Sequence, residues 1–171
     1  AIIHDRLWLM GGDCCDPDAP GRDTGYYDFQ QNVWHEVADT DARGWRTGMA
    51  TRMGHALVAL PSGDRLWLMG GWRQDGGPCG DMWEFDGSGW TRLEAPCDLC
   101  LFGAVATETG VWRFGGFAEP GGAGCLTVTS HDLAGKTAVD TDVGTVFGQN
   151  PMRQYCASSL FALDPSRGPS G

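Results

Sequence analysis

The sequence predicts an all-β protein built from repeated four-stranded antiparallel units, and three observations lead to this prediction. The residues Asp5–Gly12, DRLWLMGG, recur letter for letter at Asp64–Gly71, and Gly110–Gly116 is a looser third copy. Apolar runs of about four to six residues, bounded by Gly, Pro, Asp and Ser, are too short for typical helices. The 27 glycines and eight tryptophans among 171 residues indicate a folded, turn-rich chain.

The first two units show the same order of strands. The first has the end of a strand at Ala1–Ile3, followed by Leu7–Met10, Tyr26–Phe29 and Trp34–Val37. The second has Arg52–Leu60, Leu66–Met69, Asp81–Asp86 and Trp90–Leu93. Because the second strand of each unit is continuously apolar rather than alternating, we expect both faces of its sheet to be covered.

The third unit departs from this order. Its first two strands are expected at Phe102–Ala106 and Val111–Phe114, and its third at Leu160–Asp164. Residues 117–158 are interpreted as a long insertion, in which Val128–Leu133 and Thr145–Phe147 form a small hairpin. The predicted divisions of the chain are therefore 1–37, 38–93 and 94–171.

The repeated order of an apolar strand, a strand ending in Gly-Gly, an aromatic-acid strand and a Trp strand resembles the kelch repeat. The double glycines recur at intervals near the roughly 50-residue period of that family. The resemblance covers the chain except residues 117–158, and it implies an incomplete β-propeller of about two and a half to three blades. We expect further blades, or self-association, to close the ring.

The glycine pairs and the outer tryptophans are expected to be structural. A glycine pair ends each central strand where positive φ or a close backbone approach is needed, which residues with a Cβ resist. Trp34 and Trp90, at the start of the outer strands, are predicted to belong to the core. The glycines concerned are Gly11, Gly12, Gly70, Gly71, Gly115 and Gly116.

The long loops of such a meander emerge on one face, which is where binding is expected. Its candidate contact residues are aromatic or cationic, types that dominate interface energetics. They are Trp45, Arg46, Arg52, Trp72, Arg73 and Phe117. The alternative is that Trp45 or Trp72 covers a sheet end and that Arg52 donates hydrogen bonds to loop carbonyls.

All seven cysteines fall in the same loops: Cys14, Cys15, Cys79, Cys97, Cys100, Cys125 and Cys156. Disulfides that close long loops are one interpretation, with Cys125 and Cys156 placed to tie the base of the insertion. Unpaired loop thiols are another. Cys97 and Cys100 have the spacing of zinc ligands, but no second such pair exists, so no metal is predicted.

Composition restricts the classes of partner. A net charge of −10 disfavours nucleic acid and anionic lipid, and no apolar run reaches the length of a membrane span. His4, His35 and His55 lie at strand positions and are expected to be structural, whereas His131 falls in a loop. The loop cysteines favour an extracellular over a cytoplasmic location, although both stay open.

These features lead to a protein-interaction scaffold as the first functional hypothesis, with a protein partner bound by the loop face. No catalytic motif or cofactor site is visible, so an enzyme is not favoured. The alternative is part of a secreted kelch-like enzyme or carbohydrate-binding propeller, similar to galactose oxidase or sialic acid epimerases. Copper chemistry of that kind needs Tyr, His and Cys together, and no such set is evident here.

Overall fold

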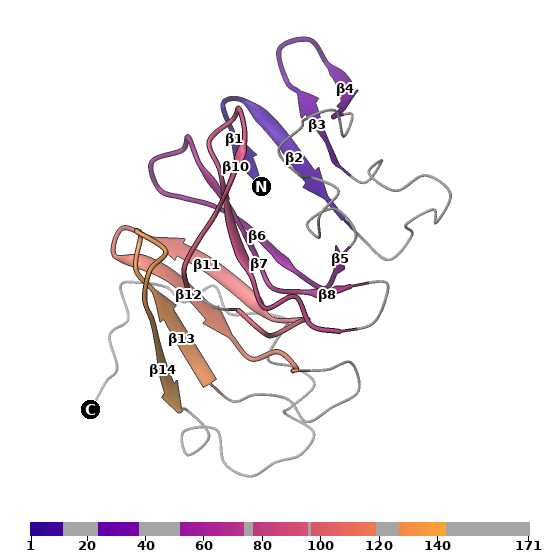
Figure 1. Cartoon of the computed structure of the whole chain (residues 1–171). Helices are drawn as coiled ribbons and strands as arrows, with labels where there is room; N and C mark the ends of the chain where they lie inside the picture. Colours follow the sequence, from indigo (N-terminus) through magenta and orange to yellow (C-terminus); the bar gives the residue numbers. More distant parts are fainter. Residues whose placement is uncertain (12–23, 38–51, 74–76, 96, 119–126, 143–171) are drawn as a thin grey trace, which may run out of the picture.

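The chain folds into antiparallel β-sheets. The computed structural model describes residues 1–11, 24–37, 52–73, 77–95, 97–118 and 127–142. Every regular element in these ranges is a strand, which confirms the predicted all-β class, and three four-stranded sheets lie side by side in chain order (Figure 1). No helix in these ranges has the length and apolar character of a membrane span.

The first sheet contains β1 (Ile2–Ile3), β2 (Arg6–Met10), β3 (Thr24–Asp28) and β4 (Val33–Glu36), in that order. His4 and Asp5 join β1 to β2 with φ angles of 51° and 54°, the backbone that two-residue hairpins favour. After β3, the Asp28 carboxylate accepts hydrogen bonds from the backbone N–H groups of Gln30 and Gln31. This local turn directs the chain back into β4.

The second sheet contains β6 (Ala56–Ala59), β7 (Leu66–Met69), β9 (Met82–Phe85) and β10 (Trp90–Arg92), in that order. The turn into β10 has the same kind of hydrogen bonds as the turn into β4. The Asp86 carboxylate accepts hydrogen bonds from the backbone N–H groups of Ser88 and Gly89. The strands β5 (Arg52–Met53) and β8 (Trp72–Arg73) pair separately as a short two-stranded ribbon.

The third sheet contains β11 (Gly103–Thr107), β12 (Gly110–Phe114), β13 (Thr127–His131) and β14 (Ala138–Asp142), in that order. The prediction of an insertion over 117–158 is therefore wrong for residues 127–142, which complete the sheet. The partner of β13 is β14, not Thr145–Phe147. Both Thr145–Phe147 and Leu160–Asp164 lie outside the described residues.

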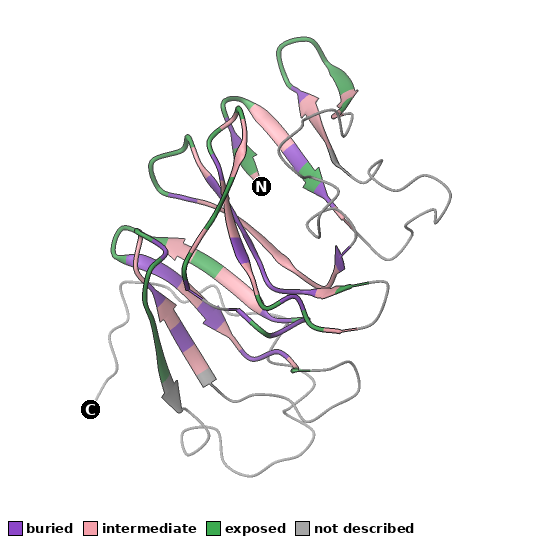
Figure 2. Cartoon of the chain, viewed as in Figure 1, coloured by how far each residue is buried: buried purple, intermediate pink, exposed green. Residues whose placement is uncertain are grey.

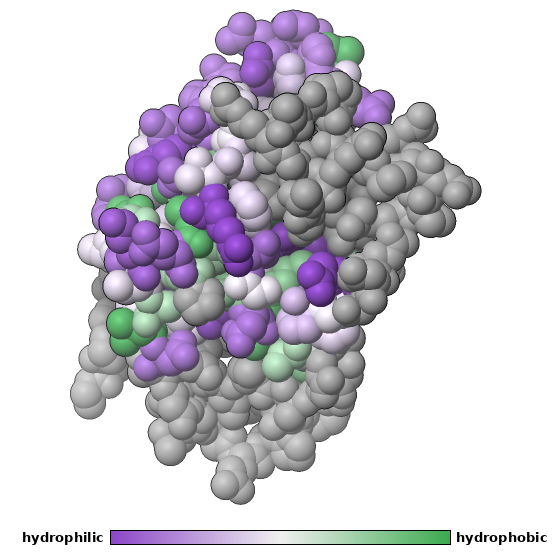
Figure 3. Space-filling model, in the orientation of Figure 1, coloured by the Kyte–Doolittle hydropathy of each residue, from purple (hydrophilic) through white to green (hydrophobic). Residues whose placement is uncertain are grey.

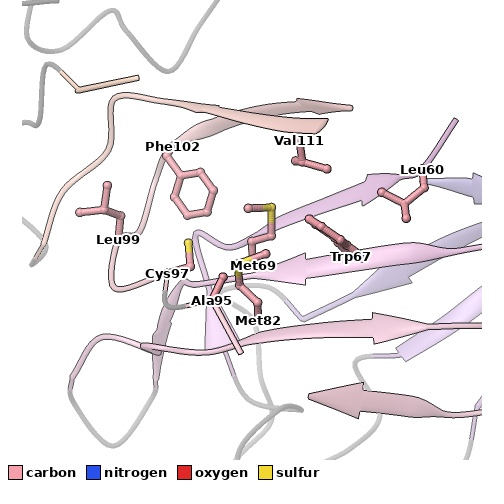
Figure 4. Packing of buried hydrophobic residues seen from close by; sticks show 9 residues of the cluster. All are labelled: Leu60, Trp67, Met69, Met82, Ala95, Cys97, Leu99, Phe102 and Val111. Atoms are coloured by element: carbon pink, nitrogen blue, oxygen red, sulfur yellow. The ribbon is translucent and has the colours of Figure 1, made fainter. Parts of the chain in front are cut away.

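The core lies between the sheets, as alternation along β7 requires. Leu66 and Leu68 point toward the first sheet and pack with Ile3, Trp8, Met10 and Phe85. Trp67 and Met69 point the other way and pack with Met82, Phe102 and Val111 (Figure 4). All four β7 side chains have 0% exposure (Figure 2), so both faces of the second sheet are covered, as expected.

The outer tryptophans differ from the prediction that both are core. Trp34 in β4 is 54% exposed, and Trp90 in β10 is half-buried. Each lies opposite an aromatic residue of the neighbouring strand, Tyr27 and Phe85 respectively. The second sheet has the first sheet packed over this face, whereas the described residues place no sheet over the corresponding face of the first. This difference explains the exposure of Trp34.

Candidate functional site

The double-glycine corners place connecting segments against the ends of the central strands. Within the described residues, Gly11, Gly70, Gly71, Gly115 and Gly116 all have positive φ, between 55° and 105°. At Gly70 a Cβ would collide with the carbonyl oxygen of Leu99 and lie 2.9 Å from that of Cys97. The neighbouring Gly71 N–H donates to the Leu99 carbonyl at 2.8 Å. The corner thus fixes the segment 97–101 beside β7. Gly12 lies outside the described residues.

Arg52, in β5, donates hydrogen bonds to this same corner. Its guanidinium donates to both oxygens of the Asp81 carboxylate, at 2.7 and 3.2 Å, and to the Gly70 carbonyl at 3.0 Å. The indole N–H of Trp83 donates to Asp81 at 2.7 Å. Burial raises the pKa of Asp81, but the hydrogen bonds and charge of Arg52 outweigh it and leave that pKa below its ordinary value.

Arg52 is therefore not an exposed contact residue. Its exposure is 1%, so the prediction that it binds a ligand is corrected in favour of hydrogen bonding within the corner. His55 lies beside it, and burial, together with the Arg52 charge, lowers the pKa of His55 to about 4. The imidazole is neutral at pH 7, and it packs against the corner as a structural side chain.

The ribbon of β5 and β8 brings together two segments that the sequence placed in separate loops. Arg52 pairs with Arg73, and Met53 pairs with Trp72. Trp72 also forms a bridge with Pro78, and the Arg73 N–H donates to the Gly77 carbonyl at 2.9 Å. Arg73 is exposed and Trp72 is half-buried, so both present side-chain surface at the loop end.

Leu101 is an exposed apolar residue at the same loop end that the sequence pattern did not indicate. It is 50% exposed, and its φ of 54° is uncommon for a residue with a branched apolar side chain. Its N–H donates to the Gly54 carbonyl at 2.7 Å, and its side chain lies over Gly54, which follows β5. An apolar residue in a loop gives no sequence signal of left-handed backbone, and so the position was not predictable.

Phe117 lies next to this position. Its backbone exchanges two hydrogen bonds with Cys100, the residue before Leu101, at 2.8 and 2.9 Å. Its side chain is half-buried. The structure therefore joins Trp72, Leu101 and Phe117 through one network of backbone contacts. We call these residues the loop-end surface: Met53, Trp72, Arg73, Pro78, Leu101 and Phe117. Trp45 and Arg46 lie outside the described residues.

The cysteines that the structure describes are buried. Cys97 and Cys100 are free thiols, so the disulfide interpretation is wrong for these two. Burial raises the pKa of both thiols, and for Cys97 it outweighs the nearby Arg113 charge. Cys79 is also buried. No group of three metal-ligating side chains occurs among the described residues. The remaining four, Cys14, Cys15, Cys125 and Cys156, lie outside the described residues.

A second buried polar cluster lies between the second and third sheets. Arg113 donates to the Cys97 sulfur at 3.0 Å and to the Thr129 hydroxyl at 2.8 Å, and Thr129 donates to Asp140 at 2.6 Å. His131, expected in a loop, is instead the last residue of β13 and is 1% exposed. Burial and the Arg113 charge lower its pKa to about 4, outweighing Asp140 and Asp132. Arg113, Thr129 and His131 are buried in this cluster, whereas the Asp140 side chain is 67% exposed at its edge.

Comparison of the chain with protein-family models and with curated protein sequences gives no match.

Proposed function

We propose that this chain is part of a kelch-like β-propeller scaffold that binds a protein partner through the loop-end surface. Support for the propeller comes from three four-stranded sheets in one repeated strand order and from glycine corners at equivalent places in each. Support for binding comes from the convergence of exposed or half-buried apolar and cationic side chains at the corner of the second sheet.

The observation that carries the binding proposal is Leu101. A left-handed backbone costs an ordinary residue roughly 1–2 kcal/mol, and glycine or asparagine would avoid most of that cost. Leucine there also exposes half of its side chain to water. Strained backbone persists where the surrounding structure enforces it, and such positions cluster at functional sites. A partner that covers Leu101 would account for both costs.

The neighbouring side chains define the chemistry of that partner. Trp72 offers a large, rigid apolar surface, and the exposed Arg73 offers a planar fork that matches carboxylates. We infer that the partner presents an apolar side chain near an acidic group. Phe117, whose backbone pairs with Cys100 next to Leu101, adds a half-buried aromatic residue to this surface.

Substitution of Leu101 by Asn tests this proposal, because asparagine tolerates the same backbone and removes the apolar side chain. The parent chain, Leu101→Asn and a control, Val33→Asn, would be immobilised and their retained proteins compared by quantitative mass spectrometry. Val33 is a 43% exposed apolar residue of β4, away from the loop-end surface.

We expect a protein retained by the parent and the control to be depleted about tenfold or more by Leu101→Asn, and its purified form to bind with correspondingly weaker affinity. Trp72→Ala should weaken the same interaction. If every retained protein binds Leu101→Asn and the parent equally well, the loop-end surface is not the binding site.

A further inference from the structure

One strand sequence occurs in two places with opposite exposure. The residues Arg6–Met10 of β2 and Arg65–Met69 are identical, yet Leu9 is 51% exposed whereas its counterpart Leu68 is 0% exposed. Both leucines lie on the same face of their sheets, because the two strands pair with their neighbours in the same way. The face of the first sheet that carries Leu9 thus has the composition of a covered face.

The structure also shows what covers such a face. The leucine side of β7 packs against Trp8 and Met10 of the first sheet. The opposite side of β7, with Trp67 and Met69, packs against Val111 of the third sheet. Each contact therefore joins the tryptophan side of one sheet to the leucine or valine side of the next.

This pairing leaves two sides uncovered within the described residues: the leucine side of the first sheet and the tryptophan side of the third sheet. On the first sheet, the uncovered side contains a cross-strand row and two further apolar residues, which we call the first open face: Ile2, Leu7, Tyr27 and Trp34, with Leu9 and Phe29. Ile2, Phe29 and Trp34 are 53%, 49% and 54% exposed. Contiguous exposed apolar surface of this kind marks an interaction site.

On the third sheet, the uncovered side contains Trp112 and Phe114, the counterparts of Trp67 and Met69. Trp112 lies in the row Val105, Trp112, Ser130 and Val139, and Phe114 lies opposite Val128. These residues form the second open face. Val105 and Val139 are 47% and 61% exposed. On the side of the molecule that Figure 3 shows, hydrophobic residues are interspersed with hydrophilic ones.

We propose that the second open face of one copy of this chain docks on the first open face of another copy, head to tail. We expect a second copy of the chain to cover these faces, because the chain already contains this kind of contact twice. The first sheet packs on the second in this way, and the second sheet packs on the third. The rows of Leu7 and of Trp112 include no charged side chain, and Glu36, in the row of Leu9, is a charged residue at the edge of the first open face. The net charge of −10 opposes association between copies, and added salt screens this repulsion. This surface is separate from the loop-end surface. The inference rests on the propeller part of the proposed function, since adjacent blades of such a ring would cover the same two faces, and not on the binding of a protein partner.

Head-to-tail contacts use two different surfaces, which makes them testable by complementation. Leu9→Lys blocks only the first open face, and Val105→Lys blocks only the second. Both positions are about half exposed, so the lysine ammonium can reach water in the monomer. Val33→Lys is the matched control, because Val33 is an exposed apolar residue on the opposite side of the first sheet.

Sedimentation velocity over a wide concentration range would measure association of the 171-residue chain. We expect the parent and Val33→Lys to associate, more strongly as salt rises, and either blocking variant alone to associate about thirtyfold less tightly. A mixture of Leu9→Lys and Val105→Lys should form a dimer that stops at one copy of each.

A parent that stays monomeric, or association that survives Leu9→Lys, would overturn the proposal. Dimers of Val105→Lys alone would show that the first open face pairs with itself and would overturn the head-to-tail arrangement. If either variant fails to fold by circular dichroism, Trp34→Lys and Val139→Lys serve as the same complementing pair.

Discussion

Arg52 and Asp81, 29 residues apart in the chain, meet as a two-point ion pair at the corner of the second sheet. The Arg52 side chain is 1% exposed and the Asp81 side chain 18% exposed. The same guanidinium donates to the Gly70 carbonyl, and Trp83 donates to the same carboxylate. The pair therefore joins the segment before β6, the end of β7 and the start of β9.

Substitution Arg52→Leu should lower the free energy of unfolding by about 3–5 kcal/mol, because it leaves the Asp81 carboxylate partly buried without its counter-ion. Urea unfolding at neutral pH would measure the loss. Arg65→Leu is the control, since Arg65 is 38% exposed where it pairs with Glu84, and exposed pairs contribute less than about 1 kcal/mol. Equal losses in the two variants would contradict a structural role for the buried pair.

Most strands of this fold could be predicted from the sequence because their side chains are apolar or aromatic. The strand β13 was predicted, as Val128–Leu133, but was assigned to an insertion, and β14 was missed because its sequence, AVDTD, is mostly polar. They lie at the outer side of the third sheet, where Val139 is 61% exposed, and such strands need little apolar surface. Their β-branched residues, Val and Thr, were the available signal.

The positions of the candidate residues were predictable in part. Trp72, Arg73 and Phe117 do lie at one loop end, but the sequence could not distinguish them from Arg52, whose partner Asp81 is distant in the chain. Burial of Trp34 was wrongly predicted because its strand pattern matches that of Trp90, and the pattern does not say whether a neighbouring sheet is present. Leu101 depends on a backbone angle that no residue pattern encodes.

Gly70 should tolerate no side chain. Gly70→Ala adds a Cβ that collides with the Leu99 carbonyl, and it also requires a left-handed backbone, since φ is 55°. Gly63→Ala is the matched control, because Gly63 has a φ of 75° but no atom within 4 Å of its added Cβ. We expect Gly63→Ala to cost about 1 kcal/mol and Gly70→Ala clearly more, measured by thermal or urea unfolding. Equal costs would show that strain alone matters at the corner.

Stability should fall as the pH is lowered from about 6.5 to about 4. His131 and His55 both have a pKa of about 4 in the folded chain against an ordinary 6.5, so the unfolded chain binds protons first. Each histidine then lowers the free energy of unfolding by at most about 3 kcal/mol. This loss of stability is complete below pH 4 and absent above pH 6.5. Urea unfolding between pH 7.5 and 5 would measure this slope.

His131→Leu should remove the His131 part of that slope and keep the part due to His55. His4→Asn is the control, because His4 is exposed in the turn between β1 and β2 and asparagine tolerates its positive φ. A slope that is unchanged by His131→Leu would mean that the imidazole between the second and third sheets is accessible to protons from water without unfolding.

The left-handed backbone at Leu101 should lower the stability of the fold, whatever its role in binding. Leu101→Asn should raise the free energy of unfolding by about 0.5–1 kcal/mol, because asparagine adopts positive φ more readily and the lost side chain is half exposed. Leu101→Val keeps an apolar side chain but should lower that free energy by about 1 kcal/mol, since β-branched residues resist this backbone. Urea unfolding of both variants beside the parent would measure these changes.

If Leu101→Asn stabilises the fold while it weakens partner binding, the leucine is retained for contact at a cost in stability. If Leu101→Asn instead destabilises the chain as much as Leu101→Val, the leucine is held by packing on Gly54, and the reason to assign it to an interface disappears.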